Sequence, residues 1–415
     1  MTNESLLSKN KFKLFIFFIY IIIIVLTEKL YHEYLFNKSI EIEKKIYENS
    51  SKQTIKFYKI ITHFGSKNII IPIFILIIIF FPINISYTFL SIIILSTYYT
   101  NILKLLYGCP RPFWINPSIK KICDCGFGNP SGHSFAAFSF YLSLWNLIIE
   151  IPFFSKKKYF KIIFFIFFII LSFFISISRI YLSIHSFNQI IYGALLGIGL
   201  YFYFFHIIQL HKYSGKKFFK YIIGSFESKI HLIKYILYIL ILFLLYRFKK
   251  NNWKKYNYIL NNICPQFPDY RKFNKDGLYV GLIIFLLIGA HYGLFFFIYI
   301  IQKQKQFNYE EINNWNKGNN IKLLFYKFII FIPHILPIII YFIIPNNLSI
   351  IIIYSIKVIF SFFITGILAF GLYFYICIQF RIAYKNIYLF NNFNEEEINN
   401  NSIQIKVKKE NNIFK

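Results

Sequence analysis

Long apolar runs recur along this chain and constrain its fold more than any other feature. Ile69–Phe81, Ile162–Ser178 and Val358–Phe380 contain neither a charged residue nor an amphipathic period. A helix crosses the hydrocarbon core of a bilayer with roughly 20 apolar residues. The alternative, a soluble protein with a very large core, would need polar residues at helical spacing. The runs therefore predict an all-α, polytopic membrane protein.

About ten spans can be placed along the sequence. They lie near Lys13–Leu26, Gly65–Phe81, Asn84–Leu105, His133–Pro152, Tyr159–Ser176, Phe187–Leu210, Leu232–Tyr246, Gly277–Gln302, Ile321–Ile344 and Ser349–Phe380. A polar stretch from Glu28 to His63 follows the first span. Because no small-residue cleavage site follows that span, an uncleaved anchor is favoured over a signal peptide.

The formal net charge of +29 does not point to nucleic acid. Lys, Asn, Ile, Phe and Tyr are abundant and Ala is scarce, which indicates an AT-rich coding sequence that raises the Lys content. No basic stripe interleaved with aromatic residues lies on a soluble domain. The positive loops instead fit helix orientation and contact with anionic lipid, so the bilayer is an expected partner and nucleic acid is not.

Three short polar segments interrupt the apolar chain, at residues 104–112, 130–133 and 178–185. Polar groups are costly within a membrane protein and are usually retained for function. Together the segments collect three permanent cations and two imidazoles within about eighty residues. This set suits the binding of a phosphate and the cleavage of its ester bond.

The first segment offers two cations. Lys104 ends a span, where a lone lysine usually extends its ammonium group to the interface. Arg111 follows between Pro110 and Pro112, which stiffen the turn. A guanidinium held there can present its paired N–H groups to phosphate oxygens.

The second segment precedes an apolar stretch and reads as a helix start with Ser131 as the cap. Free backbone N–H groups and the helix dipole bind anions there, and Gly132 permits close approach. His133 could donate a proton to a leaving oxygen. The alternative is an ordinary cap followed by a surface histidine.

The third segment supplies a second guanidinium, Arg179, and a candidate nucleophile, His185. Neutral imidazole can attack phosphorus through Nε2 when an acceptor holds its Nδ1–H. Gln189 lies four residues on, which places it on the same helical face. The alternative for His185 alone is a polar residue at the membrane interface.

Together, the segments resemble the signature of the type 2 phosphatidic acid phosphatase (PAP2) superfamily: Lys-x6-Arg-Pro, Pro-Ser-Gly-His and Ser-Arg-x5-His. The matching positions are Lys104, Arg111, Pro112, Pro130, Ser131, Gly132, His133, Ser178, Arg179 and His185. The resemblance covers roughly residues 55–210. It implies a six-helix core with a catalytic face outside the cytosol, and neither a metal nor a cofactor.

The resemblance also implies roles. His185 would form a phosphohistidine, and His133 would protonate the leaving alcohol and then activate water. Lys104, Arg111 and Arg179 would hold the phosphoryl oxygens, joined by Ser131 and Gly132, while Gln189 would orient the nucleophile. The expected fold is a PAP2-type core at 55–210, after an anchor helix and polar connector at 1–54. About four additional transmembrane helices follow at 211–380, and a polar cytoplasmic tail at 381–415.

Gln189 departs from the Asp that many PAP2 members carry, and it resembles the glucose-6-phosphatase branch. The segments 107–114 and 126–133 instead resemble PAP2 proteins broadly, including sphingoid-base phosphate phosphatases. The apolar setting favours a lipid phosphate, such as phosphatidate, over a small soluble phosphate such as a sugar phosphate.

A catalytically silent transporter or scaffold on this fold is the alternative from another class. The membrane spans argue against a soluble vanadate-dependent haloperoxidase, which shares the signature.

The basic loops 155–158 and 211–217 are expected on the cytoplasmic side by the positive-inside rule. The three polar segments then face the lumen of the endoplasmic reticulum or another endomembrane, or the extracellular space. The basic stretch from Arg247 to Lys275 also falls on the lumenal or extracellular side, and its charge argues against this orientation. An oxidising lumen would allow disulfides among Cys109, Cys123, Cys125 and Cys264, although unpaired thiols are equally compatible with the sequence.

Overall fold

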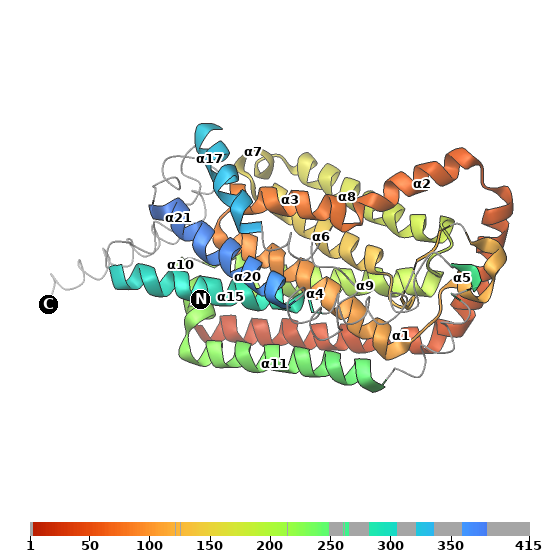
Figure 1. The fold of residues 1–415 in the computed structure, drawn as a ribbon, viewed down its shortest axis with the longest axis horizontal. Helices are drawn as coiled ribbons and strands as arrows, with labels where there is room; N and C mark the ends of the chain where they lie inside the picture. Colours follow the sequence, from red (N-terminus) through yellow and green to blue (C-terminus); the bar gives the residue numbers. More distant parts are fainter. Residues whose placement is uncertain are drawn as a thin grey trace.

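The computed structural model describes residues 3–248 apart from 121, 125 and 214, together with 260, 262–264, 282–304, 321–335 and 359–379. Within these residues the chain is helical and contains no strand, which confirms the predicted all-α class. The main helices are α1 (Asn3–Asn49), α2 (Lys52–Phe64), α3 (Lys67–Phe80), α4 (Ile83–Tyr107), α5 (Pro112–Ile115), α6 (Gly132–Glu150), α7 (Pro152–Ser155), α8 (Lys158–Tyr181), α9 (Phe187–Phe202), α10 (Gly215–Ile223), α11 (Ser225–Phe248), α15 (Ile284–Gln304), α17 (Ile321–Phe331), α20 (Ser361–Ile367) and α21 (Tyr373–Gln379). Figure 1 shows the longer helices running roughly side by side along the long axis of the molecule.

Six helical segments of the described chain are long and apolar enough to cross a membrane, by length and composition. They are Lys11–Asn49, Lys52–Phe80, Ile83–Ile115, Lys158–Tyr181, Phe187–Lys212 and Lys229–Phe248. Ile284–Ile300 and Ser361–Cys377 are apolar but shorter. The predicted spans near 277–302, 321–344 and 349–380 lie partly outside the described residues, and the predicted tail at 381–415 lies wholly outside them. The protein is therefore an integral membrane protein with several spans.

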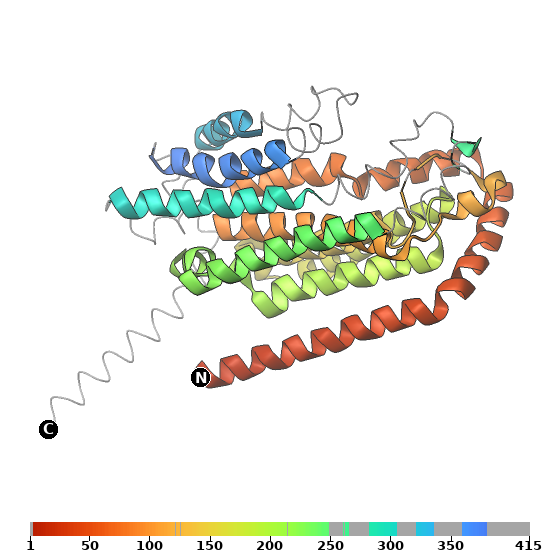
Figure 2. The same ribbon diagram turned by 60° about the horizontal axis from the view of Figure 1, so that its bottom comes forward.

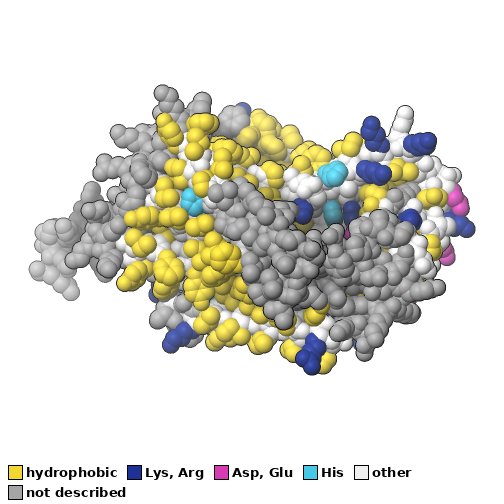
Figure 3. All heavy atoms as spheres, in the orientation of Figure 1, with side chains coloured by type: hydrophobic (Ala, Val, Ile, Leu, Met, Phe, Trp, Pro, Cys, Tyr) yellow, Lys and Arg dark blue, Asp and Glu magenta, His cyan; other side chains and the backbone are white. Residues whose placement is uncertain are grey.

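The outward faces of the spanning helices are hydrophobic. On α8, the side chains of Ile163, Phe167 and Phe173 are each more than half exposed. Figure 3 shows a broad hydrophobic area on the described surface, with Lys and Arg side chains gathered toward the right end near α2. Such faces are unfavourable in water but match the acyl chains of a bilayer.

Helix α6 lies at the centre of the core, packed against α4, α8 and α9. It is not among the six candidate spans, although the sequence predicted a span there. Glycines on α9 allow its backbone to approach α6 closely. A Cβ at Gly193 would lie 2.5 Å from the Ser131 carbonyl oxygen, and one at Gly197 would lie 2.6 Å from that of Phe135. This small-residue spacing is typical of closely packed membrane helices.

Helix α1 is longer than the sequence indicated. The polar stretch after the first span is also helical, so α1 continues unbroken to Asn49 and α2 begins at Lys52. Its 47 residues correspond to about 70 Å, more than twice the hydrocarbon thickness of a bilayer. Figure 2 shows α1 running beside the core and curving toward α2. Ser39 and Glu43 of this second half are buried, and the Phe187 backbone N–H donates to Ser39 Oγ (3.1 Å).

The polar segments meet at one end of the bundle, where α4 and α8 end and α6 and α9 begin. Gly108, with φ of 60°, ends α4, because a left-handed residue is needed there. Ser131 caps α6 through the Ser134 N–H, which confirms the predicted cap. The loop between α5 and α6 is joined to the segment after α11 by a disulfide between Cys123 and Cys264. Cys109 is a free thiol, and Cys125 lies outside the described residues.

The helices after the core form a second group beside α4. Both α11 and α15 contact α4, and α15 packs closely against α20. Glycines make this contact tight, since a Cβ at Gly366 would lie 2.5 Å from the Ala290 backbone nitrogen. Figure 1 places α15, α20 and α21 away from the end that carries α5.

Candidate active site

The structure brings the predicted site residues together at the α5 end of the bundle. Lys104 lies in the last turn of α4, and Arg111 directly precedes α5. His133 lies in the first turn of α6, Arg179 in the last turn of α8, and His185 just before α9. Residues up to 81 positions apart in the chain thus contribute to one site.

His185 is held from both ring nitrogens. It is 2% exposed, its Nδ1 lies 3.0 Å from Gln189 Oε1, and its Nε2 lies 3.4 Å from Arg111 Nη1. A guanidinium can only donate, so Nε2 must carry a lone pair and the proton belongs on Nδ1. The tautomer assigned in this way is the one in which Nε2 can act as a nucleophile.

Gln189 is itself fixed by the surrounding loops. Its Nε2 donates to the Pro110 carbonyl (2.9 Å), and its Oε1 also accepts from the Ser186 backbone N–H (3.4 Å). A Cβ at Gly128 would lie 2.5 Å from Gln189 Nε2 and 2.6 Å from Oε1. Gly128 therefore provides the space that the amide occupies, a role that the sequence analysis missed.

The two arginines are buried with their guanidinium groups at the site. Arg111 is 2% exposed, and its Nε donates to the Gly126 carbonyl (2.8 Å). Arg179 is 4% exposed, and its Nη1 donates to Thr62 Oγ1 on α2 (2.8 Å). The Nε of Arg179 has no hydrogen-bond partner among the described residues. A buried donor without a partner is costly, and a bound anion would satisfy it.

The charges of the site act on both histidines. Burial lowers the pKa of His185 well below its usual range, and Arg111, Arg179 and Lys104 lower it further. Burial and Arg179 likewise hold the pKa of His133 well below its usual range, although Asp124 acts in the opposite direction. Lys104 also lowers the pKa of His133. Both imidazoles are therefore neutral at pH 7.

Ser131 contributes to the site through the fold and not through a free side chain. Its backbone N–H donates to the Gln189 carbonyl (2.9 Å), and its hydroxyl accepts from Ser134 Oγ (3.2 Å). The first-turn N–H groups of Gly132 and His133 come next, where a helix N-terminus offers donors to an anion. Of the two residues predicted to bind phosphate in this segment, Gly132 is therefore the better placed.

A buried polar network from α1 supports the loops of the site. Glu28 Oε1 accepts from the side-chain amides of Asn129 (2.6 Å) and Asn188 (2.9 Å). His32, one turn further along α1, lies 2.9 Å from the same oxygen. This network was not predicted from the sequence, although a Glu and a His four residues apart directly after an apolar run are a usable signal.

Asp124 was also missed. Its carboxylate pairs with Arg111 and with Arg179, at 3.0 and 3.3 Å. Acidic residues are few in this basic chain, with 17 Asp and Glu against 46 Lys and Arg. A single Asp between the first two motifs is therefore a usable signal in the sequence.

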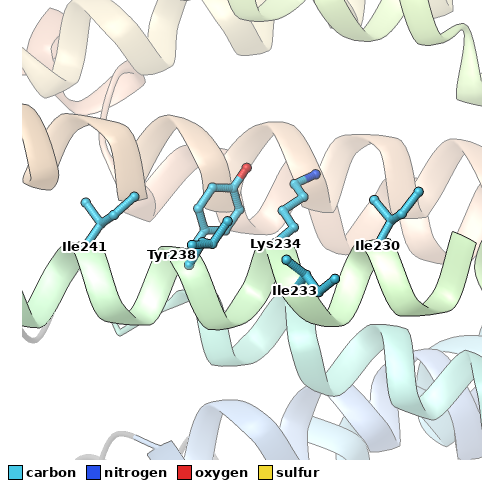
Figure 4. Close-up of a pocket in the computed structure, with 6 residues that line it drawn as sticks. Ile230, Ile233, Lys234, Tyr238 and Ile241 are labelled. Atoms are coloured by element: carbon cyan, nitrogen blue, oxygen red, sulfur yellow. The ribbon is translucent and has the colours of Figure 1, made fainter.

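A separate groove lies along α11. Figure 4 shows five of its six lining residues labelled on that helix; the full set is Ile230, Ile233, Lys234, Leu237, Tyr238 and Ile241. Its cavity volume is about 340 Å³. The lining is mostly aliphatic and, unlike the three polar segments, combines no imidazole with a guanidinium.

Residues 85–213 match the family model of the PAP2 superfamily, and the three polar segments lie inside that match. The chain is also similar to a solved transmembrane PAP2-type phosphatidylglycerolphosphate phosphatase from Bacillus subtilis. The two share 20% sequence identity with a TM-score of 0.38, over 44% of this chain and 90% of that chain. No curated protein matches the chain significantly.

Proposed function

We propose that the chain is an integral membrane phosphatase that hydrolyses a phosphate monoester, because residues 85–213 match the family model of the PAP2 superfamily. The orientation of His185 carries the proposal. Its Nδ1 lies against Gln189 and its Nε2 points to Arg111, so that a phosphoryl group held by the guanidinium would meet the nucleophilic nitrogen.

The proposed reaction proceeds in two steps. His185 Nε2 attacks phosphorus while the bond to the alcohol oxygen breaks, and His133 gives its proton to that oxygen. Water then attacks the phosphohistidine, His133 takes one of its protons, and His185 and inorganic phosphate are released. Lys104, Arg111 and Arg179 hold the phosphoryl oxygens throughout, since catalysis of phosphoryl transfer is mostly positioning and charge stabilisation.

The acid role of His133 requires that it gain a proton when substrate binds. Burial and the cations around His133 lower its pKa. A phosphate dianion would offset those cations and favour the imidazolium. Binding of the dianion and protonation of the acid are therefore coupled in this proposal.

We further propose a lipid phosphate, such as phosphatidate or a sphingoid-base phosphate, as the substrate. The helices that deliver Thr62 and Arg179 carry exposed aromatic side chains, among them Phe57 on α2 and Phe174 on α8. Their rings contact each other edge to face, with centroids 6.5 Å apart. Acyl chains in the bilayer could lie against this surface while the phosphate enters the polar end.

Phosphate release by the purified full chain tests the reaction and the substrate together. The assay contains EDTA and compares phosphatidate, lysophosphatidate, sphingoid-base phosphate and glucose 6-phosphate. We expect release from at least one lipid phosphate and loss of about 10⁴-fold or more in His185→Ala, because the nucleophile is removed. His63→Ala, which removes an exposed histidine at the end of α2, is the matched control and should retain activity.

Two results would contradict the proposal. Hydrolysis of glucose 6-phosphate alone would refute the lipid preference and favour a sugar phosphatase. Undiminished release by His185→Ala would refute the mechanism. Rapid quenching of the reaction with ³²P-labelled lipid provides a direct check. The wild-type protein should carry a ³²P label that is released by acid, as a phosphohistidine is, and His185→Ala should carry none.

A further inference from the structure

Asp124 places one carboxylate oxygen between two guanidinium groups. Its Oδ2 lies 3.0 Å from Arg111 Nη1 and 3.3 Å from Arg179 Nη2. Both distances are those of ion pairs, and a phosphoryl oxygen bridging the same arginines would make equivalent contacts. The carboxylate therefore stands where the proposed function requires an oxygen of the substrate.

The three partners differ in exposure. The side chains of Arg111 and Arg179 are 2% and 5% exposed, whereas that of Asp124 is 35% exposed. The two guanidinium groups are therefore the buried part of the site, and the Asp124 carboxylate contacts them from the more exposed side. An incoming anion would approach from the side that Asp124 occupies.

Asp124 is charged in this setting. Burial alone would raise its pKa, but Arg111, Arg179, Lys104 and His133 outweigh burial and hold the pKa below the usual value. One carboxylate contributes a single negative charge against three permanent cations. A phosphate monoester dianion carries more charge and more acceptor oxygens, so it can displace the carboxylate from the arginines.

A disulfide holds the backbone next to Asp124, whereas a phosphate can displace the Asp124 carboxylate from the arginines. Cys123, its neighbour, is bonded to Cys264 across 141 residues of sequence. We therefore expect the side chain, and not the loop, to turn away when phosphate enters. The same side chain can return to the arginines when phosphate leaves.

We propose that Asp124 is an internal ligand of the phosphate site: its carboxylate occupies a phosphoryl-oxygen position in the empty enzyme and competes with substrate and with inorganic phosphate. This inference rests on the proposed function of the site. Asp124 sets the affinity for the phosphoryl group and takes no part in bond cleavage.

The test is competitive inhibition of lipid phosphate hydrolysis by inorganic phosphate in the full chain. Asp124→Asn is nearly isosteric and removes the charge, and Asp124→Ala removes the group. Both should lower the inhibition constant for phosphate by about tenfold, because the competing charge-assisted contacts are lost. Glu150→Gln is the matched control, since Glu150 pairs with His211 (3.5 Å) at the opposite end of α6. That variant should leave the constant unchanged.

The outcomes separate this inference from the proposed function. If wild type hydrolyses lipid phosphate but both Asp124 variants bind phosphate no more tightly, Asp124 merely positions the arginines and the inference is wrong. If wild type hydrolyses nothing, the proposed function fails, and equilibrium binding of ³²P-phosphate decides the inference instead. Tighter binding in the two Asp124 variants would then support it, and equal, weaker or absent binding would overturn it.

Discussion

At the scale of single residues, the site depends on how the His185 ring is held. The amide of Gln189 orients the ring without adding a negative charge, and Gly128 leaves room for that amide. Each of these two contacts has a measurable consequence.

Gly128→Ala should lower kcat by about 10- to 100-fold, because the new Cβ would overlap the Gln189 amide and move it from His185. The φ angle of Gly128 is not in the left-handed region, so alanine itself is compatible with the backbone. Steady-state kinetics in the wild-type and Gln189→Ala backgrounds check this. An equally large effect of Gly128→Ala in both backgrounds would show that Gly128 acts by another route.

The depressed pKa of His185 predicts the acid limb of the pH profile. His185 stays neutral below the ordinary pKa of histidine, so protonation of His185 should not lower kcat/KM between pH 7 and 6. In Gln189→Asp a carboxylate would face the imidazole against the charges of Arg111, Arg179 and Lys104. This should raise the pKa of His185 and move the acid limb upward by about one unit. The pH profiles of wild type and Gln189→Asp are measured with the same substrate, so that the ionisation of the substrate affects both equally. Acid limbs that coincide in the two profiles would contradict the assignment of this limb to His185.

At the scale of helices, α1 acts as a support for the site and not only as a membrane anchor. Its Glu28 holds Asn129, which precedes the α6 segment, and Asn188, which precedes Gln189. A single carboxylate therefore fixes the loops that carry both histidines.

Glu28→Ala should lower kcat/KM by about tenfold and destabilise the protein by roughly 2–3 kcal/mol, because two buried amide donors lose a charged acceptor. Glu33→Ala, an exposed change one turn further along α1, is the control and should be close to neutral. Activity and thermal unfolding in detergent measure the two effects. Wild-type values for both variants would mean that α1 serves only as an anchor.

At the scale of the whole molecule, the Cys123–Cys264 disulfide bears on orientation. Disulfides form in oxidising compartments, so this bond agrees with a site that faces the lumen or the cell exterior. The positive-inside rule places the basic loop around Lys156 on the other side.

Labelling with a membrane-impermeant maleimide in sealed microsomes checks this orientation. Ser118 is exposed on the loop that carries Asp124, and Ser118→Cys should react only after the membrane is permeabilised. Lys156→Cys should react from outside the microsomes. The reverse pattern would invert the topology, and the disulfide should be reassessed by mass spectrometry of the unreduced chain.

The sequence by itself determined the helical membrane class, most of the spans in the core, the cap at Ser131 and the three motifs. These features are local, since apolar runs, caps and motif spacings can be read within a few turns of chain. Only the tertiary structure decided that α1 reaches the site, that Gly128 makes room for Gln189 and that Asp124 lies between the arginines. Except for the pair of Asp124 with Arg111, those contacts join residues 55 to 160 positions apart. Such pairings are set by how the helices pack, and no local pattern encodes them.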